Sequence, residues 1–147
     1  MIYCMERRDL LLLFIAMPGG SYTTDRIRIM KGLFLLTQDG PKEIRGAYEF
    51  RPYNYGPFDT SIYHDLERLE TEGLIRIQAS GVPGRDAYET TSQGEAKARD
   101  LEAGLQPVTV SAIRETKRFV TAVSFVDLLR HVYEKHQDYA VKSVARL

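Results

Sequence analysis

The sequence predicts a mainly α-helical chain that carries one small antiparallel β-hairpin, and three observations lead to this fold class. Residues 60–72 form an amphipathic helix bounded by turn signals. Two short runs of β-forming residues follow directly within residues 74–90, joined by a Gly/Pro-rich loop. Helical periodicity then resumes up to residue 136. This order is typical of a winged helix-turn-helix, which we expect over residues 1–104, with a C-terminal helical extension over 105–147 that packs on it or forms a dimer or partner surface.

The first predicted helix spans residues 5–17, and a Pro-Gly-Gly turn at 18–20 ends it. Residues 10–17 are apolar on every side, which indicates a helix that is buried all round or shared with a second subunit. The Arg pair at 7–8 before this run is also a feature of signal peptides. A core helix is the better interpretation, because acidic residues flank the arginines and the apolar run is too short to span a bilayer.

The second predicted helix spans residues 25–37, with Thr24 as its N-cap, and it is the expected first half of the helix-turn-helix. The connection to the second half is longer than the short turn of the simplest motif. Within that connection, aromatic and charged residues alternate over 47–51. We therefore expect a short strand there with one buried face, paired with the wing.

Residues 60–72 are the expected recognition helix. Asp59 can accept from the amides of the first turn, and Gly73 is placed to end the helix in a left-handed conformation. Phe58 and Tyr63 have the spacing of a hydrophobic staple. An apolar stripe marks the buried face: Ile62, Leu66 and Leu69.

The other face of this helix supplies four candidate DNA contacts: Thr60, Ser61, His64 and Arg68. Side chains of these types can hydrogen-bond a base edge or a phosphate. Acidic residues share the region: Asp59, Asp65, Glu67, Glu70 and Glu72. Because like charge repels DNA, these acids are the strongest argument in the sequence against DNA binding.

The predicted wing consists of strands over 74–79 and 85–90, and its cations are Arg76 and Arg85. An arginine at a hairpin tip can contact a DNA phosphate, and a solvated side chain is the alternative. Tyrosines near the sheet and the turn could stack on bases, although packing is their more common role. These tyrosines are Tyr48, Tyr53, Tyr55 and Tyr63.

Three further helices are predicted after the wing, over residues 92–103, 108–122 and 125–136. Thr90 or Thr91 caps the first, Pro107 opens the second and Ser124 starts the third. The second helix has an expected solvent side that carries Arg114, Lys117 and Arg118. Together with the first helix, these elements offer more apolar surface than a minimal winged helix covers, so we expect a homodimer or a partner surface.

The composition is that of an ordinary globular protein, with 44% hydrophobic and 27% charged residues in 147. Its 20 basic and 20 acidic residues cancel, whereas nucleic-acid-binding proteins more often have a basic excess. Cys4 is the only cysteine, so no intramolecular disulfide can form. We therefore expect a protein of the reducing cytoplasm that does not insert into membranes.

The sequence contains no pattern that indicates an enzyme, a cofactor or a metal site. His131 and His136 point to different sides of one predicted helix and cannot share a metal ion on one face. A Gly-rich phosphate loop, a nucleophile elbow and a His-Glu-x-x-His motif are all absent from the sequence. We expect a non-enzymatic protein with no cofactor.

Three segments together resemble a family of small bacterial proteins: RIRIMKGLFLLTQ, YEFRPYNYGPFDTSIYHDLERLETEGLI and FVDLLRHVYEKHQDYAVKS. They are similar to the YwgA-like group and, more distantly, to the SocA-like antitoxin (Panacea) domain. A separate pattern, Gly-Leu-Ile followed by Tyr-Glu-Thr-Thr and Gly-Glu, is similar to the wing and next helix of MarR- and PadR-type regulators. Those proteins usually carry Leu at the position of Thr90. The resemblance implies a winged-helix-like regulator or antitoxin, and it carries over no catalytic residue.

Two functions are consistent with these observations. The first is a winged-helix DNA-binding protein, a transcriptional regulator that places residues 60–72 in the major groove and 74–90 on the backbone. The alternative is an antitoxin or adaptor that binds a partner protein, such as a toxin, and does not bind DNA. The wing pattern favours the first, whereas the acidic recognition helix and the zero net charge favour the second.

Overall fold

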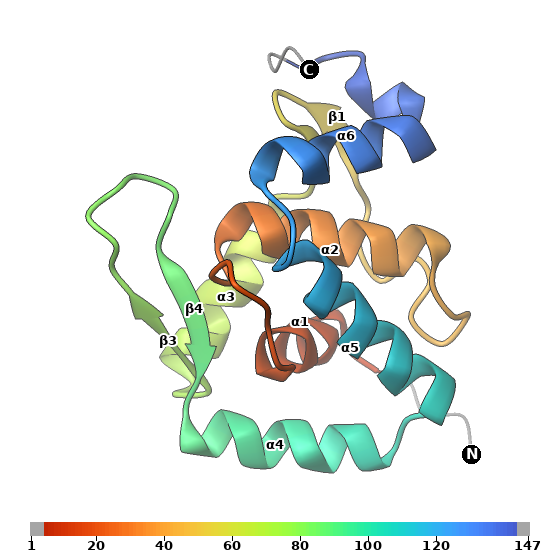
Figure 1. Ribbon diagram of the computed structural model, residues 1–147. Helices are drawn as coiled ribbons and strands as arrows, with labels where there is room; N and C mark the ends of the chain where they lie inside the picture. The colour runs from red at the N-terminus through yellow and green to blue at the C-terminus, as the bar shows by residue number, and fades with distance from the viewer. Residues whose placement is uncertain (1–4, 144–147) are drawn as a thin grey trace.

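The structure is a computed structural model, and it describes residues 5–143. This part of the chain is mainly helical and contains two separate two-stranded antiparallel sheets (Figure 1). Its α-helices are α1 (Arg7–Ala16), α2 (Arg26–Asp39), α3 (Ser61–Thr71), α4 (Ser92–Ala103), α5 (Pro107–Val120) and α6 (Phe125–Lys135). Its strands are β1 (Arg51–Tyr53), β2 (Gly56–Phe58), β3 (Ile75–Gln78) and β4 (Ala87–Thr90), and a 3-10 turn, η1, spans Gln137–Ala140.

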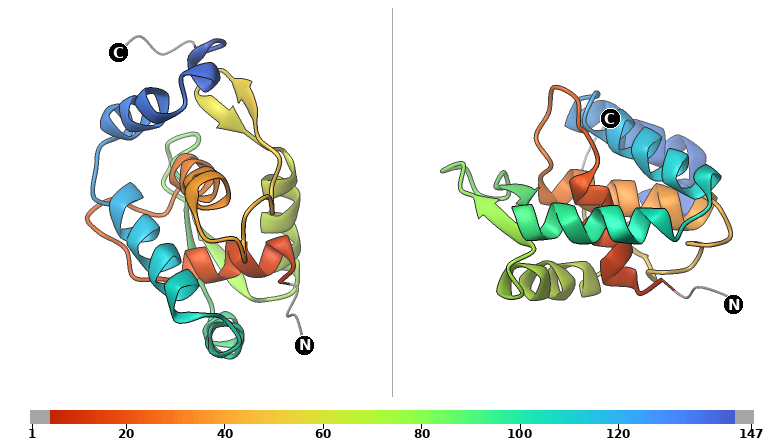
Figure 2. Two further views of the ribbon diagram at one scale, coloured as in Figure 1. Left: turned by 90° about the vertical axis from the view of Figure 1, so that its right-hand side faces the viewer. Right: turned by 90° about the horizontal axis from the view of Figure 1, so that it is seen from below.

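Helix α1 is the centre of the fold. All six residues from Leu10 to Ile15 are buried, because α1 packs against α2, α3, α4, α5 and β4 (Figures 1 and 2). This arrangement explains why the helix is apolar on every side. It also means that a single chain covers the apolar run in full.

The C-terminal helices pack on the N-terminal part of the chain. Helix α5 lies against α1 and α2, and α6 lies against α2 and β2. The apolar stripe of α6 is buried there through Leu128, Leu129 and Val132. The two apolar faces that led to the expectation of a homodimer are therefore both covered inside one chain, and that reason for a second subunit no longer holds.

Helix α3 leads directly into the β3–β4 hairpin. Gly73 has a φ of 76°. Its amide donates to Glu70 O, and the amide of Leu74 donates to Leu69 O, which is the Schellman pattern expected at a left-handed C′ glycine. Strand β3 then pairs with β4, and the hairpin projects from the helical body (Figure 1).

The caps show why most helices begin where the sequence predicts. Thr91 accepts from the amide of Gly94, and Ser124 accepts from the amide of Asp127. Helix α2 differs by one residue, because Asp25 rather than Thr24 is the N-cap and accepts from Arg28 N. The predicted helices and the β3–β4 hairpin are thus confirmed to within two residues at almost every end.

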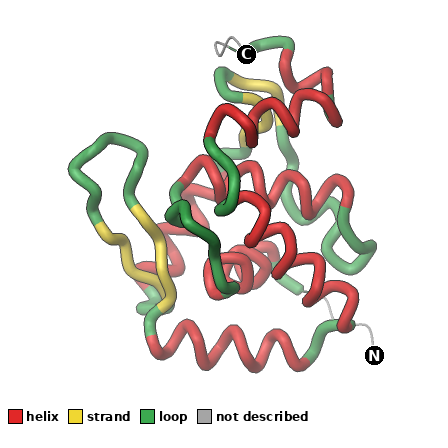
Figure 3. The backbone as a smooth tube through the Cα atoms, in the orientation of Figure 1, coloured by secondary structure: helices red, strands yellow, loops and turns green. Residues whose placement is uncertain are grey.

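The strand predicted over 47–51 is wrong. Residues 47–50 form no strand, although Tyr48 and Phe50 are buried there; the strand begins at Arg51 and pairs with β2 rather than with the β3–β4 hairpin. Gly56 makes this second hairpin possible, because its φ of 89° lets the chain reverse immediately after Tyr53. The two sheets lie apart in the molecule (Figure 3).

Two buried cations join helix ends that are distant in the sequence. Lys117 Nζ donates to three carbonyl oxygens at the end of α1, those of Phe14, Ile15 and Met17, at 2.9–3.0 Å. Arg28 donates to the carbonyls of Val120 and Val123 at the end of α5, and it also pairs with Asp25 at 2.6 Å. The prediction that Lys117 faces solvent is therefore wrong, because the free carbonyls of α1 give the ammonium buried acceptors.

Candidate nucleic-acid interface

Helix α3 lies at the outside of the molecule in both views of Figure 2. Its apolar stripe faces the core, where Ile62, Leu66 and Leu69 are buried. The N-cap of α3 is Thr60 rather than the predicted Asp59, and it makes no capping hydrogen bond through its side chain. Asp59 Oδ1 still accepts from Ser61 N at 2.8 Å, and the ring centres of Phe58 and Tyr63 lie 5.4 Å apart, as the staple predicts. These contacts hold the start of the helix in place, and the apolar stripe holds the rest of it against the core.

The face of α3 that points away from the core is polar. At about 100° per residue, Thr60, His64, Glu67 and Thr71 form the line most remote from the apolar stripe, and all four are exposed. Ser61 and Arg68 lie on one flank of that line. Tyr63 and Glu70 lie on the other flank. Of the four DNA contacts predicted on this helix, Thr60 and His64 thus lie on the outward line. The other two, Ser61 and Arg68, lie on one flank.

Asp65 is not on the exposed face, which corrects the prediction. Only 1% of the residue is exposed. Its carboxylate accepts from the Tyr48 hydroxyl at 2.7 Å and pairs with Arg7 Nε at 2.9 Å. Burial and the hydrogen bond to Asp65 raise the pKa of Tyr48 far above its usual range, so Tyr48 remains a donor at any physiological pH. The acid locks α3 against α1 and the segment before β1.

Other acids near α3 also have partners within the fold. Glu72 pairs with Arg8 of α1, and Asp59 accepts from the amides of Glu49 and Ser61. Among residues 5–143, Glu67 and Glu70 are the acids of α3 that make no hydrogen bond or ion pair through their side chains. The negative charge that the outer face of α3 presents is therefore smaller than the sequence indicates.

The hairpin cations differ from each other. Arg76 is paired across the strands with Glu89 at 2.6 Å, which satisfies its charge on an exposed face. Arg85 lies in the loop of the hairpin, is exposed and has no side-chain partner in the described part of the chain. Arg85 is thus available to an external anion, whereas Arg76 would have to leave Glu89 first.

A further cation, Arg26, joins the hairpin to the flank of α3 that carries Tyr63. Arg26 Nε donates to the Tyr88 hydroxyl at 2.9 Å, and its guanidinium lies 4.5 Å from the centre of the Tyr63 ring. The hydrogen bond to Tyr88 raises the pKa of Arg26. This role of Arg26 could not be predicted from the sequence, because Tyr63 and Tyr88 are far from Arg26 along the chain.

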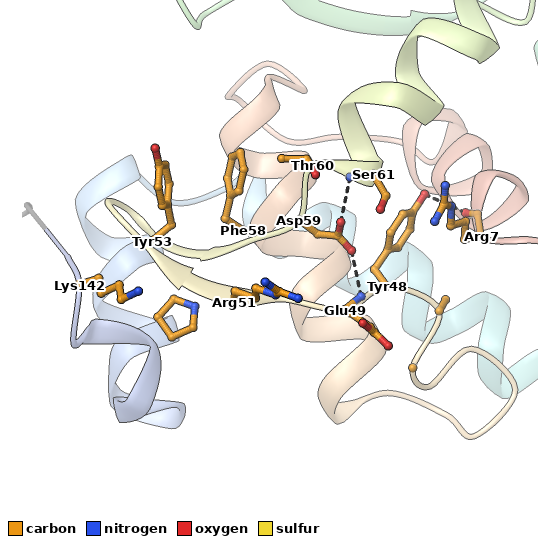
Figure 4. A pocket seen from close by; sticks show the side chains of 13 residues that line it. Arg7, Tyr48, Glu49, Arg51, Tyr53, Phe58, Asp59, Thr60, Ser61 and Lys142 are labelled. Atoms are coloured by element: carbon orange, nitrogen blue, oxygen red, sulfur yellow. Dashed lines mark hydrogen bonds between the residues drawn. The ribbon is translucent and has the colours of Figure 1, made fainter.

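A groove of about 980 Å³ borders the N-terminal end of α3 at Thr60 and Ser61, as Figure 4 shows. Three cations line the groove along its length: Arg7 at one end, Arg51 in the middle and Lys142 at the other end. A smaller cavity of about 540 Å³ continues past Arg7 to Arg8 and Arg68. Of these cations, only Arg68 was predicted to contribute. The β1–β2 hairpin that carries Arg51 was missed, and Arg7, Arg8 and Lys142 are far from α3 along the chain.

The tyrosines divide into packing and exposed residues. Tyr48 is buried and Tyr63 is half-buried. Tyr53 and Tyr55, in contrast, are 51% and 47% exposed at the β1–β2 hairpin. Only the latter pair is therefore free to contact a partner.

No metal site is formed within residues 5–143, where no three metal-binding side chains come together. His136 Nε2 lies 3.0 Å from Asp39 Oδ2, and the His131 ring packs on Phe119 at 4.7 Å. Burial lowers the pKa of His131. Both histidines thus take part in packing contacts between α6 and its neighbours.

Comparisons with family models, with curated proteins and with solved structures found no match to this chain. In the described residues, no helix combines the length and the apolar character needed to cross a bilayer.

Proposed function

We propose that this chain is a winged-helix DNA-binding protein of the transcriptional regulator type, with α3 as the recognition helix and the β3–β4 hairpin as the wing. One observation supports this proposal most directly. The outward polar line of α3 lies between two flanks that each carry arginines, Arg26 on one side and Arg7 and Arg68 on the other. A helix in the major groove lies between two phosphate backbones in the same way.

The pairing of two acids inside the fold reduces the electrostatic objection. Asp65 and Glu72 pair with Arg7 and Arg8, which offsets their charges, whereas Asp59 accepts from backbone amides and keeps its charge. Thr60 and His64 are then in position to read base edges, and Glu67 can accept from the amino group of a cytosine. Arg68 and Arg85 are the proposed phosphate contacts.

The test of this proposal is the salt dependence of DNA binding. Arg68→Ala and Arg85→Ala should each weaken binding to every duplex alike and reduce the slope of log Kd against log salt by about one. Arg99→Ala is the matched control, because Arg99 is exposed on α4 and has no side-chain partner in the described residues. If Arg99→Ala reduces the slope as much as the other two, binding is non-specific and the proposal fails.

A second function, an antitoxin or adaptor that binds another protein, is favoured by a different observation. Tyr53 and Tyr55 are both exposed on the β1–β2 hairpin, and tyrosine is enriched among the residues that contribute most to protein interfaces. Glu67 and Glu70 could then face a basic surface of the partner. Glu67→Gln with Glu70→Gln should weaken such a complex. The same double variant should bind DNA equally well or more tightly.

A further inference from the structure

We propose that the groove beside α3 is a second phosphate-binding surface, which holds the DNA backbone on the side of α3 opposite the wing. This inference rests on the proposed function and extends it to residues outside the helix and the wing. Four cations form this surface, and we refer to them as the groove cations: Arg7, Arg51, Arg68 and Lys142. Its ligand is the sugar-phosphate backbone of double-stranded DNA.

The first argument is position. Tyr63 and Arg26 connect one flank of α3 to Tyr88 of the wing. Ser61 and Arg68, on the other flank, open into the two cavities that contain the groove cations. The smaller cavity therefore lies on the side of the outward line that is opposite the β3–β4 hairpin. The groove continues from it past the N-terminal end of α3, where Phe58, Thr60 and Ser61 line it. A duplex whose major groove receives α3 presents one backbone to each side.

The second argument is charge. Arg51 and Lys142 are exposed and form no ion pair within residues 5–143. Arg7 pairs with Asp65 but remains 46% exposed along its side chain. Two acids oppose these cations: Glu49 in the groove and Glu6 in the smaller cavity. Asp59 also lines the groove, but its two carboxylate oxygens accept from backbone amides. Over the two cavities together, five cations and four carboxylates from residues 5–143 line the surface, so the formal charge there is positive by one.

The third argument is shape. The groove extends from Lys142 past Arg51 to Arg7, as Figure 4 shows, so its cations form a row rather than a cluster. A row suits an extended polyanion, whereas a single phosphate or carboxylate ligand needs donors that converge on one point. Tyr53 stacks on Phe58 at 4.9 Å along the rim and presents a hydroxyl that can donate to a phosphate oxygen.

The experiment compares Arg51→Ala/Lys142→Ala with wild type in the full chain, by fluorescence anisotropy on one 30-base-pair duplex over a series of salt concentrations. Each lost phosphate contact reduces the slope of log Kd against log salt by about 0.9. We expect a reduction of about two for the double variant. Over a fourfold range of salt, its affinity should therefore fall roughly tenfold less than that of wild type.

Two controls make the result specific. Arg99→Ala/Arg118→Ala removes two exposed arginines of α4 and α5, and its slope should equal that of wild type. Arg51→Lys with Lys142→Arg keeps both charges and should restore the wild-type slope. Thermal melting of each variant shows whether the fold is intact, and no change is expected because both side chains are exposed.

The outcomes separate the two proposals. If wild type binds DNA, Arg85→Ala lowers the slope and the groove variant does not, the groove inference is overturned while the DNA-binding proposal stands. If wild type binds no duplex, both are overturned. If wild type binds and the groove variant loses two contacts beyond the control, the inference is supported.

Discussion

Lys117 and Lys31 are both buried lysines, and they differ in the number of acceptors that each one has. The ammonium of Lys117 has three carbonyl acceptors and lies 5.4 Å from the centre of the Phe14 ring. Lys31 Nζ donates to the carbonyl of Pro57 at 3.0 Å, and no second acceptor is present in the described residues. Within residues 5–143, the ammonium of Lys117 therefore has three hydrogen-bond acceptors, whereas the ammonium of Lys31 has one.

Lys117→Met should destabilise the protein by about 3 kcal/mol, because it leaves three buried carbonyl oxygens at the end of α1 without a donor. Urea denaturation at pH 7 measures this effect. Arg118→Met is the matched control, since Arg118 is exposed on the same helix and should change the free energy of unfolding by less than about 0.5 kcal/mol. Equal effects of the two substitutions would contradict this role for Lys117.

Lys31 should make stability rise with pH. Burial lowers its pKa from 10.5 to about 7, so above pH 7 the folded chain loses a proton that the unfolded chain keeps up to about pH 10.5. Between these values one proton contributes at most about 1.4 kcal/mol per pH unit in favour of the folded state. This contribution is complete above pH 10.5, and it is lost as pH falls towards 7.

The measurement is the free energy of unfolding from pH 6 to pH 10, for wild type and for Lys31→Met. Burial also lowers the pKa of Lys117, to about 8, so both proteins share that contribution and the difference between them isolates Lys31. We expect wild type to gain stability relative to the variant as pH rises. A difference that does not vary with pH would show that Lys31 titrates at its ordinary pKa.

At the scale of elements, local signals were enough to predict the helices and the β3–β4 hairpin from the sequence. Thr91, Ser124 and Gly73 each act within four residues of the group that they bond, so their roles are visible in a short window. Asp65 and Lys117 could not be placed in this way. Their partners lie 17 to 103 residues away, and periodicity alone assigns a charged side chain to solvent.

The β1–β2 hairpin was missed for a related reason. Pro52 and Pro57 face each other across it, and prolines normally argue against a strand. Because this hairpin has only two short strands, its prolines can lie at edge positions. The candidate site was consequently predicted only on α3 and the β3–β4 hairpin, and the groove that depends on Arg51 was not predicted.

Gly73→Ala tests the junction between α3 and the β3–β4 hairpin. Alanine at a φ of 76° costs about 1–2 kcal/mol, and its Cβ would lie 3.2 Å from Gln93 Oε1. Gly104→Ala is the control, because Gly104 ends α4 with a φ of −90° and its Cβ would have only an ordinary contact. Thermal unfolding should therefore show a lower Tm for Gly73→Ala and little change for Gly104→Ala.

At the scale of the whole molecule, the cations that cap α1 and α5 tie the two ends of the chain together. Residues 1–104 contain the proposed recognition helix and wing, but they lack Lys117, which completes α1. They also leave Arg28 and the pair that it forms with Asp25 without the carbonyls of Val120 and Val123.

We therefore expect residues 1–104, produced alone, to fail to fold. Circular dichroism should show little helix, and limited proteolysis should digest the fragment much faster than the full chain. Addition of a peptide covering residues 105–147 should restore protection if the contacts can form between separate chains. A fragment that is folded and resistant on its own would show that these contacts are dispensable.

The position of Lys117 also has a consequence for synthesis on the ribosome. Met17 and Lys117 are 100 residues apart, and chains grow at about 5–20 residues per second. The apolar helix α1 thus emerges on the order of 5–20 seconds before the residue that completes it. During this interval the leucines of α1 cannot be fully buried, because part of the core has not yet been synthesised. We therefore expect the nascent chain to bind chaperones that recognise exposed apolar segments.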